Sequence, residues 1–203
     1  MSSLADIRVG EFWDTGQGEL EGAGPVYAEL VTALRQRGIP IVRPSSLCAR
    51  PRAFGAAIVE VLAPCPGPTP FVNPNDNSFV IRASLGHRAA LLMGDAEREE
   101  EASLLNRRSV LRADFLKVGH HGSATSSSAS FIAAVGAETA AISCGVRNRF
   151  GHPHPSTLRT LLGHVHRTDR DGSIRWETDG TDTAVGFAAR SGILGSIGSG
   201  SWW

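Results

Sequence analysis

Histidine is the residue whose placement says most about the chemistry this sequence could support. The seven histidines of the 203-residue chain are His87, His120, His121, His152, His154, His164 and His166. Four of them lie in two loops that follow expected strands, which is where functional side chains are usually placed. An imidazole can bind a metal ion, or it can take up and release a proton near neutral pH. These two loops are therefore the first candidates for a site.

A carboxylate stands at the end of an apolar strand, at Asp95. The preceding segment reads LLMG, and its glycine lets the backbone pass close to a ligand. A carboxylate in this position can bridge two divalent ions. Asp is also a favoured residue for capping a helix N-terminus, and taken alone this second interpretation is the stronger one.

The next strand runs into the segment KVGHHGS, from Lys117 to Ser123. Adjacent side chains on a strand point to opposite faces, so His120 and His121 reach one ligand only if the backbone turns. The glycines on both sides make such a turn possible. The pair can bind a metal, or one histidine can bind while the other acts on a substrate. Alternatively, backbone hydrogen bonds hold both rings in a structural role.

A third segment, Asn148 to Pro155, reads NRFGHPHP. Its prolines restrict the backbone and hold His152 and His154 in fixed positions. One of these histidines can act as a general acid or contact a phosphate. The alternative is a rigid loop whose prolines start the next helix.

Other polar clusters favour structural roles. We expect His164 and His166 to lie on an exposed strand, the acidic run from Glu97 to Glu101 to be a solvated helix face, and Asp169 to Gly172 to form a hairpin turn. The cluster Asn73, Asn75, Asp76 and Asn77 lies beside prolines and is typical of a turn.

The elements that must position these residues alternate between strand and helix. Apolar alternation and β-branched runs predict strands over 7–13, 39–42, 56–62, 78–85, 88–93, 114–118, 139–143, 165–168, 174–177 and 183–188. Helical spacing predicts helices over 25–38, 97–106, 128–135 and 156–162, whereas 14–18, 43–54 and 64–74 read as loops. A hairpin turn is expected at 86–87. The fold class is therefore α/β or α+β, with a mixed sheet.

Composition favours a folded, soluble protein. Hydrophobic residues make up 41% and charged residues 20%, which argues against disorder. The chain has 20 basic residues (lysine and arginine) and 20 acidic residues (aspartate and glutamate). This excludes a uniformly basic protein that coats nucleic acid, but it does not exclude a local basic groove. There is no apolar run long enough to cross a membrane and no signal-peptide pattern. Cys48, Cys65 and Cys144 are odd in number and widely spaced, so we expect three reduced thiols in a cytoplasmic protein.

Taken in order, the motifs resemble the metallo-β-lactamase-like domain of the ComEC competence family. The matching segments are NDNSFVI at 75–81, LLMGDAE at 91–97, DFLKVGHHGSATS at 114–126, ISCGVRNRFGHPHP at 142–155 and TDRDGSI at 168–174. The resemblance runs from about Ile7 to Gly180. It implies an αββα sandwich with a metal site at one edge, and a hydrolase of phosphodiesters in DNA uptake.

The resemblance also assigns roles to individual residues. Asp95, His120 and His121 match the metal-binding positions, which implies a zinc or manganese cofactor. Lys117 and His152 are the expected catalytic residues, and Ser123, Asn148 and His154 the expected substrate contacts. The implied partner is DNA or another phosphodiester.

One departure from the family pattern concerns the first metal-binding box, a histidine- and aspartate-rich motif. No histidine precedes His87, so that box is absent here. We therefore expect residues 1–190 to form one domain corresponding to the C-terminal two-thirds of the family domain, followed by a flexible Gly/Ser-rich tail over 191–203. The N-terminal third of the family domain, which includes strands, would be missing. Its absence would leave an exposed sheet for a partner chain or for self-association.

Three hypotheses on function stay open at this point. The first is a metal-dependent phosphodiesterase or nuclease whose complete site needs the missing box. The second is a non-catalytic binding or partner module. The third is a hydrolase of the same fold that acts on an ester or thioester, because one fold hosts many chemistries.

Overall fold

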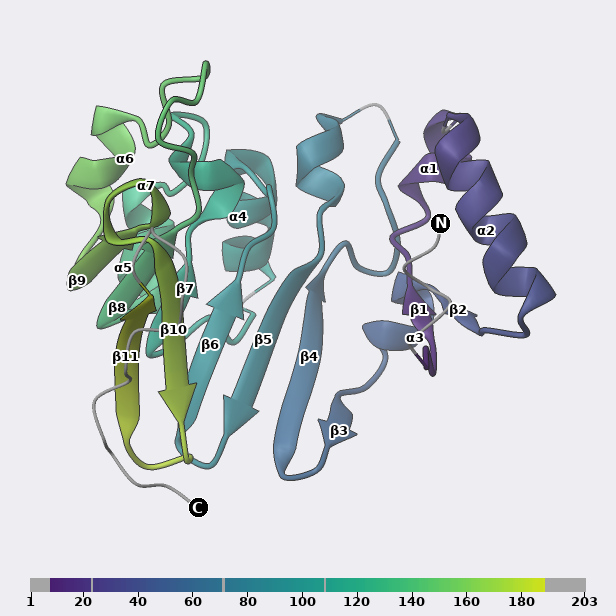
Figure 1. The fold of residues 1–203 in the computed structure, drawn as a ribbon, viewed down its shortest axis with the longest axis horizontal. Helices are drawn as coiled ribbons and strands as arrows, with labels where there is room; N and C mark the ends of the chain where they lie inside the picture. The colour runs from purple at the N-terminus through teal and green to yellow at the C-terminus, as the bar shows by residue number, and fades with distance from the viewer. Residues whose placement is uncertain (1–7, 23, 71, 108, 189–203) are drawn as a thin grey trace.

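The computed structural model describes residues 8–22, 24–70, 72–107 and 109–188, and a seven-stranded mixed sheet forms its centre (Figure 1). The strands lie in the order β3-β4-β5-β6-β7-β8-β9. Their bounds are β3 Arg52–Phe54, β4 Ala57–Ala63, β5 Val80–Leu85, β6 Arg88–Leu92, β7 Phe115–Lys117, β8 Thr139–Ile142 and β9 His164–Arg167. Strands β3 to β6 pair antiparallel, and β6 to β9 pair parallel.

The parallel half of the sheet positions the histidine loops. Its strands are joined through α4 (Arg98–Asn106), α5 (Ala129–Val135) and α6 (Pro155–Thr160). Because parallel strands run the same way, their carboxyl ends meet at one edge of the sheet. The loops after β6, β7 and β8 all leave from that edge, at the top of Figure 1.

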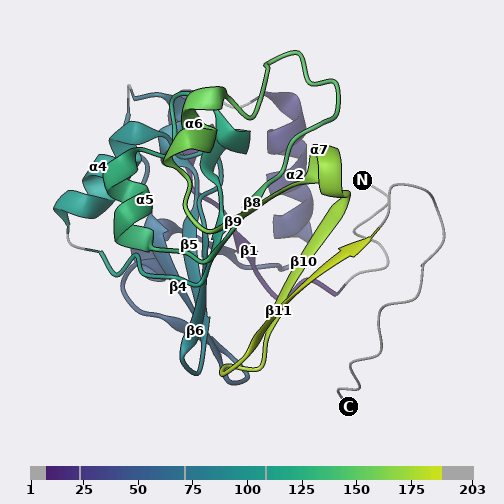
Figure 2. The same cartoon turned by 90° about the vertical axis from the view of Figure 1, so that its left-hand side faces the viewer.

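The two faces of the sheet are covered differently (Figure 2). Helices α4 and α5 pack on one face, where the buried core is formed by Val80, Leu91, Met93, Leu104, Leu116, Phe131, Ile132, Val135 and Ile142. On the other face lies the hairpin of β10 (Ser173–Thr178) and β11 (Thr183–Ala188), and Trp176 stacks on Phe115 at 5.3 Å between ring centroids. Leu92, farther along this second face, is 38% exposed.

The N-terminal part forms a small unit beside the antiparallel half of the sheet (Figure 1). It contains the parallel pair β1 (Phe12–Trp13) and β2 (Ile41–Val42), and helices α1 (Gln17–Glu21), α2 (Pro25–Gln36) and α3 (Pro44–Leu47). Helix α2 begins at Pro25 and buries Val31 and Leu34, as its helical spacing predicts. Segments 14–18 and 43–54 are not simple loops, since α1, α3 and β3 form within them.

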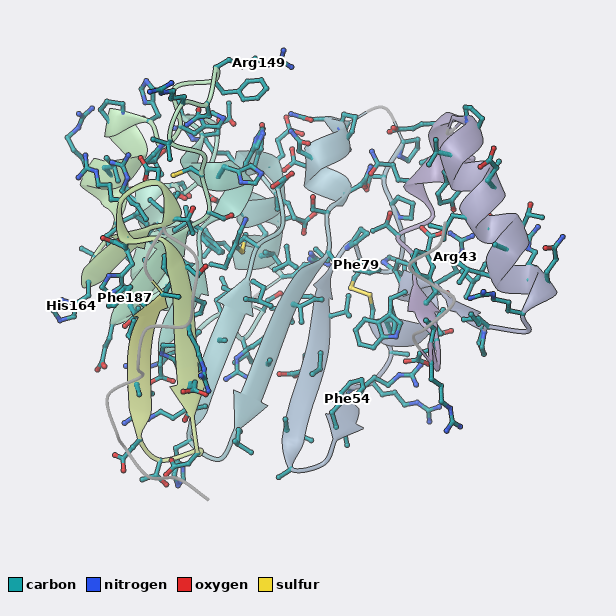
Figure 3. The ribbon with its side chains drawn as sticks, viewed as in Figure 1. Arg43, Phe54, Phe79, Arg149, His164 and Phe187 are labelled. Atoms are coloured by element: carbon teal, nitrogen blue, oxygen red, sulfur yellow. A yellow bond between two sulfur atoms is a disulfide. The ribbon has the colours of Figure 1, made fainter. Side chains whose placement is uncertain are left out.

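A disulfide joins Cys48, after α3, to Cys65, after β4 (Figure 3). The prediction of three reduced thiols is therefore wrong for this pair, and Cys144 is the free cysteine of the described residues. The two cysteines are 17 positions apart, too far for a local motif to reveal the pairing. A cross-link over a loop of that length stabilises a fold by about 3 kcal/mol through the entropy of the unfolded chain.

The acidic run at the start of α4 is not a solvated face. Glu97 and Glu101 are buried, and the Glu101 carboxylate accepts hydrogen bonds from the backbone N–H groups of Ser127 and Ser128 at the start of α5. Asp95 does not cap α4. Instead Asp76 accepts hydrogen bonds from the backbone N–H groups of Glu97 and Glu100, so the cap comes from a distant segment.

The mixed α/β class predicted from the sequence is confirmed, with the hairpin of β5 and β6 where it was expected. Residues 168–171 form a short helix, α7 (Thr168–Asp171), instead of a hairpin turn. The expected strand over 7–13 is reduced to β1 in its described part, and the expected tail over 191–203 lies outside the described residues. Within the described ranges, no helix has the length and apolar character needed to span a bilayer.

Glu100 gives the fold a testable pH dependence. Burial raises the pKa of Glu100 to about 7, with Arg107 acting in the opposite direction. The folded state therefore binds a proton that the unfolded chain releases above pH 4.5, so the free energy of unfolding should fall as pH rises from 4.5 to 7. Glu100→Gln should remove about 2 kcal/mol of this fall. Urea unfolding at a series of pH values measures the free energy of unfolding of both proteins.

The matched control is Glu99→Gln, which changes an exposed carboxylate on the same helix. Its stability profile should run parallel to that of the unchanged chain. A Glu100→Gln profile that also runs parallel would contradict the assignment to Glu100.

Candidate active site

The carboxyl edge of the parallel strands brings together the residues that the sequence singles out. Asp95 follows β6, His120 and His121 follow β7, and His152 lies in the loop that follows β8. The His120 and His121 rings are 6.2 Å apart, and the His120 and His152 rings 5.6 Å apart, between centroids. The structure therefore brings the two histidine loops together at this edge.

The turn that presents the histidine pair has an unusual backbone. His120 and His121 both lie in the left-handed region, at φ 40° and 54°. Residues held there cost on the order of 1–3 kcal/mol, and such strain concentrates at functional sites. The flanking glycines are required by close packing, since a Cβ on Gly119 would lie 2.7 Å from the Ala96 carbonyl and one on Gly122 2.7 Å from Pro153. This turn brings both rings to one edge, as the sequence interpretation required.

His120 is held by a carboxylate that the sequence analysis did not select. Its Nδ1 lies 2.5 Å from Oε1 of Glu97. With the Nδ1 proton donated to Glu97, the other ring nitrogen of His120 is left as a proton acceptor. A carboxylate-oriented imidazole of this kind can act as a general base.

Glu97 is fixed in turn by the short helix η2 (Pro74–Asn77). The side-chain amides of Asn73 and Asn75 donate to its two carboxylate oxygens at 3.0 and 3.2 Å. Burial opposes ionisation of Glu97, but hydrogen bonds involving Thr125, Asn75 and His120 outweigh it and hold its pKa below the usual value. The carboxylate therefore stays charged at neutral pH and fixes the orientation of His120.

His121 faces Asp95 with its second ring nitrogen. Its Nδ1 donates to the Ser143 carbonyl at 2.6 Å, and its Nε2 lies 3.5 Å from Oδ1 of Asp95. A backbone carbonyl that holds one ring nitrogen leaves the other free to bind a ligand. Both side chains are nearly half exposed, so a substrate can reach them.

His152 places an unpaired nitrogen beside this pair. Its Nδ1 is buried and has no hydrogen-bond partner among the described residues. Burial, and then the neighbouring His120, His121 and His154, lower the pKa of His152. The ring is therefore neutral at pH 7 and can donate or accept one hydrogen bond there.

Lys117 lies beneath the same edge. Its ammonium donates to the Gly94 carbonyl at 3.1 Å. Burial lowers the pKa of Lys117, and the nearby Asp95 carboxylate opposes this shift. Lys117 therefore holds the turn that carries Asp95.

The three expected substrate contacts make internal hydrogen bonds. Asn148 donates to the carbonyls of Gly145 and His152 and accepts from the His152 N–H. His154 accepts from the Ser156 N–H and so caps α6. The hydroxyl of Ser123 bonds Thr125 and is largely buried. Their expected roles toward a substrate stay predictions, and the structure adds a role in shaping the loops.

The donor set does not fit a resident metal centre. Among residues 8–22, 24–70, 72–107 and 109–188, no group of three or more His, Cys, Asp or Glu side chains could hold an ion. Asp95 lies near the Nε2 of His121. The Nε2 of His120 is free because its Nδ1 is held by Glu97, but no three donors of the described residues are grouped closely enough to hold an ion. Structural zinc uses four protein ligands and catalytic zinc three. A zinc or manganese site would therefore need these side chains to move together or further donors to join them.

The sequence analysis missed the residues that orient the site, chiefly Glu97, Asn73 and Asn75. Glu97 lies two positions after Asp95, and both asparagines sit in a segment that carries the family resemblance. Their contacts span 22 to 24 residues, so periodicity gives no sign of them.

Comparisons with known proteins find similarity to competence and recombination proteins. The chain is 40% identical over 121 residues to ComE operon protein 3 of Bacillus subtilis (strain 168), covering 58% of this chain and 15% of that protein. It is 35% identical over 109 residues to the competence protein ComA of Neisseria gonorrhoeae, covering 52% of this chain and 16% of that protein. Recombination protein 2 of Haemophilus influenzae is 36% identical over 104 residues, 50% of this chain and 13% of that protein.

These similarities support the resemblance to competence proteins that the motifs indicated. The chain spans about one sixth of the length of these relatives, so the activity and partners of the whole proteins are not carried over to it. No family model matches the sequence.

The Glu97–His120 pair predicts a defined tautomer. In the unchanged chain, ¹⁵N-resolved NMR of the histidine rings at pH 8 should show His120 protonated at Nδ1, because Glu97 accepts that proton. Glu97→Gln replaces the charged acceptor by a weaker neutral one and should raise the fraction of the Nε2–H tautomer severalfold.

The control for this measurement is His121, whose Nδ1 donates to a backbone carbonyl that the substitution does not touch. Its signals should keep the Nδ1–H pattern in the variant. An unchanged His120 tautomer in Glu97→Gln would contradict the role given to Glu97.

Proposed function

We propose that this chain is a phosphodiester hydrolase domain that acts on nucleic acid during DNA uptake. The observation that carries the proposal is the convergence of Asp95, His121, the Glu97-oriented His120 and His152 at one sheet edge. Similarity to competence proteins supports nucleic acid as the substrate class. The metallo-β-lactamase fold of the resembling family is part of this proposal.

The surroundings of each side chain determine its proposed role in hydrolysis. His120, oriented by Glu97, takes a proton at its free ring nitrogen from a water whose oxygen bonds to phosphorus. The P–O bond to the leaving strand breaks, and the leaving oxygen takes up a proton from solvent. His152, neutral because of burial and its histidine neighbours, donates a hydrogen bond to a phosphoryl oxygen. Asp95 and His121 form the exposed rim where the substrate enters, and Lys117 holds the turn below them.

A zinc or manganese cofactor stays a proposal from the family resemblance, because no three donors are grouped to hold an ion among the described residues. The same observation favours a second candidate, a non-catalytic module that binds nucleic acid or a partner chain. In that case Leu92 and its neighbours on the half-covered face of the sheet would meet the partner.

The cytoplasmic location expected from the sequence stays a prediction. The disulfide between Cys48 and Cys65 favours an oxidising compartment instead.

A substrate panel tests the proposed activity. The purified chain is assayed with added zinc or manganese, and in parallel with EDTA. It should hydrolyse bis(p-nitrophenyl) phosphate but not p-nitrophenyl acetate. His120→Ala should lower the rate about 100-fold, the usual contribution of a general base. Asp182→Ala, which removes an exposed carboxylate on the β10–β11 turn, should leave the rate unchanged.

The other outcomes separate the alternatives. Hydrolysis of the acetate ester alone would support an ester hydrolase of the same fold. No hydrolysis of either substrate under any metal condition would contradict the proposed activity and favour the binding module.

A further inference from the structure

The loop between β8 and α6 carries an exposed aromatic ring that the proposed hydrolysis does not use. Phe150 is 67% exposed, and Val146 in the same loop is 61% exposed. Figure 3 shows Arg149 at the far end of this loop, away from the strands of the sheet. Single exposed apolar side chains are common and need no ligand. What distinguishes Phe150 is that its neighbours hold it beside the candidate site.

The position of the Phe150 ring is defined by its neighbours. It stacks on His152 with an interplanar angle of 17° and 5.8 Å between centroids. The guanidinium carbon of Arg149 lies 5.0 Å from the centroid of the same ring. Asn148 braces the loop by bonding Gly145 and His152 from one amide. The Phe150 ring therefore contacts a residue of the site directly, and it is carried by a loop that hydrogen bonds hold in place.

The charge of the loop favours an anionic ligand. Residues 143–154 contain Arg147 and Arg149 and no acidic residue. Both arginines are exposed, and no ion pair joins either of them to a described carboxylate. The carboxylates of Asp95 and Glu97 lie at the site and repel phosphates, so the exposed loop arginines are suited to hold the backbone of a strand beside it.

An exposed ring beside guanidinium groups matches the chemistry of single-stranded nucleic acid. Aromatic side chains stack on unpaired bases of any sequence, and arginine planes add cation–π and phosphate contacts. In a duplex, both faces of each base are covered by its neighbours, so a ring of this kind has little to stack on. A single strand accounts for the ring and for both arginines together, because its bases can stack on Phe150 and its phosphates can pair with Arg147 and Arg149. A protein partner is the alternative that the experiment below separates.

We propose that Phe150 and Arg149 form a stacking platform for an unpaired base of single-stranded nucleic acid. Arg147 contacts the adjoining phosphates, and the His152 contact of Phe150 aligns the strand with the site. The proposal rests on the proposed function for its substrate class. It makes Phe150 a binding residue that selects unpaired strands.

Binding without turnover tests this proposal separately from hydrolysis. Fluorescence anisotropy of the full chain in EDTA compares three probes: labelled oligo(dT) of twelve nucleotides, an abasic strand of the same length, and a duplex of the same length. The unchanged chain should bind oligo(dT) severalfold more tightly than either other probe. Phe150→Leu should weaken oligo(dT) binding about tenfold and leave abasic binding unchanged, because one base stack is lost.

Matched variants distinguish stacking from charge and from general damage. Phe150→Trp should keep or strengthen oligo(dT) binding. Arg149→Gln and Arg147→Gln should weaken the oligo(dT) and abasic probes alike and flatten the salt dependence. Phe187→Leu changes another phenylalanine that is 52% exposed, on β11, and should alter none of the affinities (Figure 3).

Three results would overturn the platform. One is equal binding of oligo(dT) and the abasic strand by the unchanged chain. The second is a Phe150→Leu variant with unaltered oligo(dT) affinity. The third is concentration-dependent self-association that Phe150→Leu abolishes, which would make the ring a protein contact. If oligo(dT) binding depends on Phe150 but no phosphodiester is hydrolysed, the proposed activity fails and the platform stands.

Discussion

A buried carboxylate, Glu97, is the group on which the arrangement of the site depends. It accepts hydrogen bonds from Asn73 and Asn75 on one segment and from His120 on another, while its own N–H is capped by Asp76. A buried charge is costly unless it is paired and hydrogen-bonded, so each of these segments must be in place for the carboxylate to be tolerated. The same contacts that satisfy Glu97 therefore lock the η2 segment, the start of α4 and the histidine turn together.

This constraint also explains the strained histidine turn. Two residues in left-handed backbone conformations persist only where the surroundings hold them. Glu97 holds the ring of His120, and the Ser143 carbonyl holds the ring of His121. With both Nδ1 atoms engaged, the Nε2 of each ring is left free, and that of His121 lies 3.5 Å from Asp95. The result is a site with two oriented imidazoles, beside the ring of His152.

Local patterns were enough to predict the hairpin of β5 and β6, helix α2 and the alternation of strands and helices from β6 to β9. The placement of Asp95 and of the His120–His121 pair directly after strands was also predicted, whereas the meeting of these loops at one edge is seen only in the structure. The acidic run of α4 could not be predicted, because its exposure depends on partners far away in sequence: Asp76 and the turn before α5. The pairing of Cys48 with Cys65 depends in the same way on where α3 meets β4.

The loop after β8 connects the two proposals. Its inner end supplies His152, whose ring lies beside His120, and its outer end supplies Phe150 and the arginines. A strand held on the outer residues would be aligned with the imidazoles by the stacked pair of rings. Substrate selection and chemistry would then depend on one braced segment.

The measurement that tests the account most directly is the metal content of the purified chain, by elemental analysis after gel filtration, with Asp95→Ala in parallel. No three donor side chains among the described residues are grouped closely enough to hold an ion, so less than one retained ion per chain is expected. Two ions per chain that are lost in Asp95→Ala would contradict this arrangement. That result would require Asp95, His121 and the free Nε2 of His120 to move together and further ligands to complete the site.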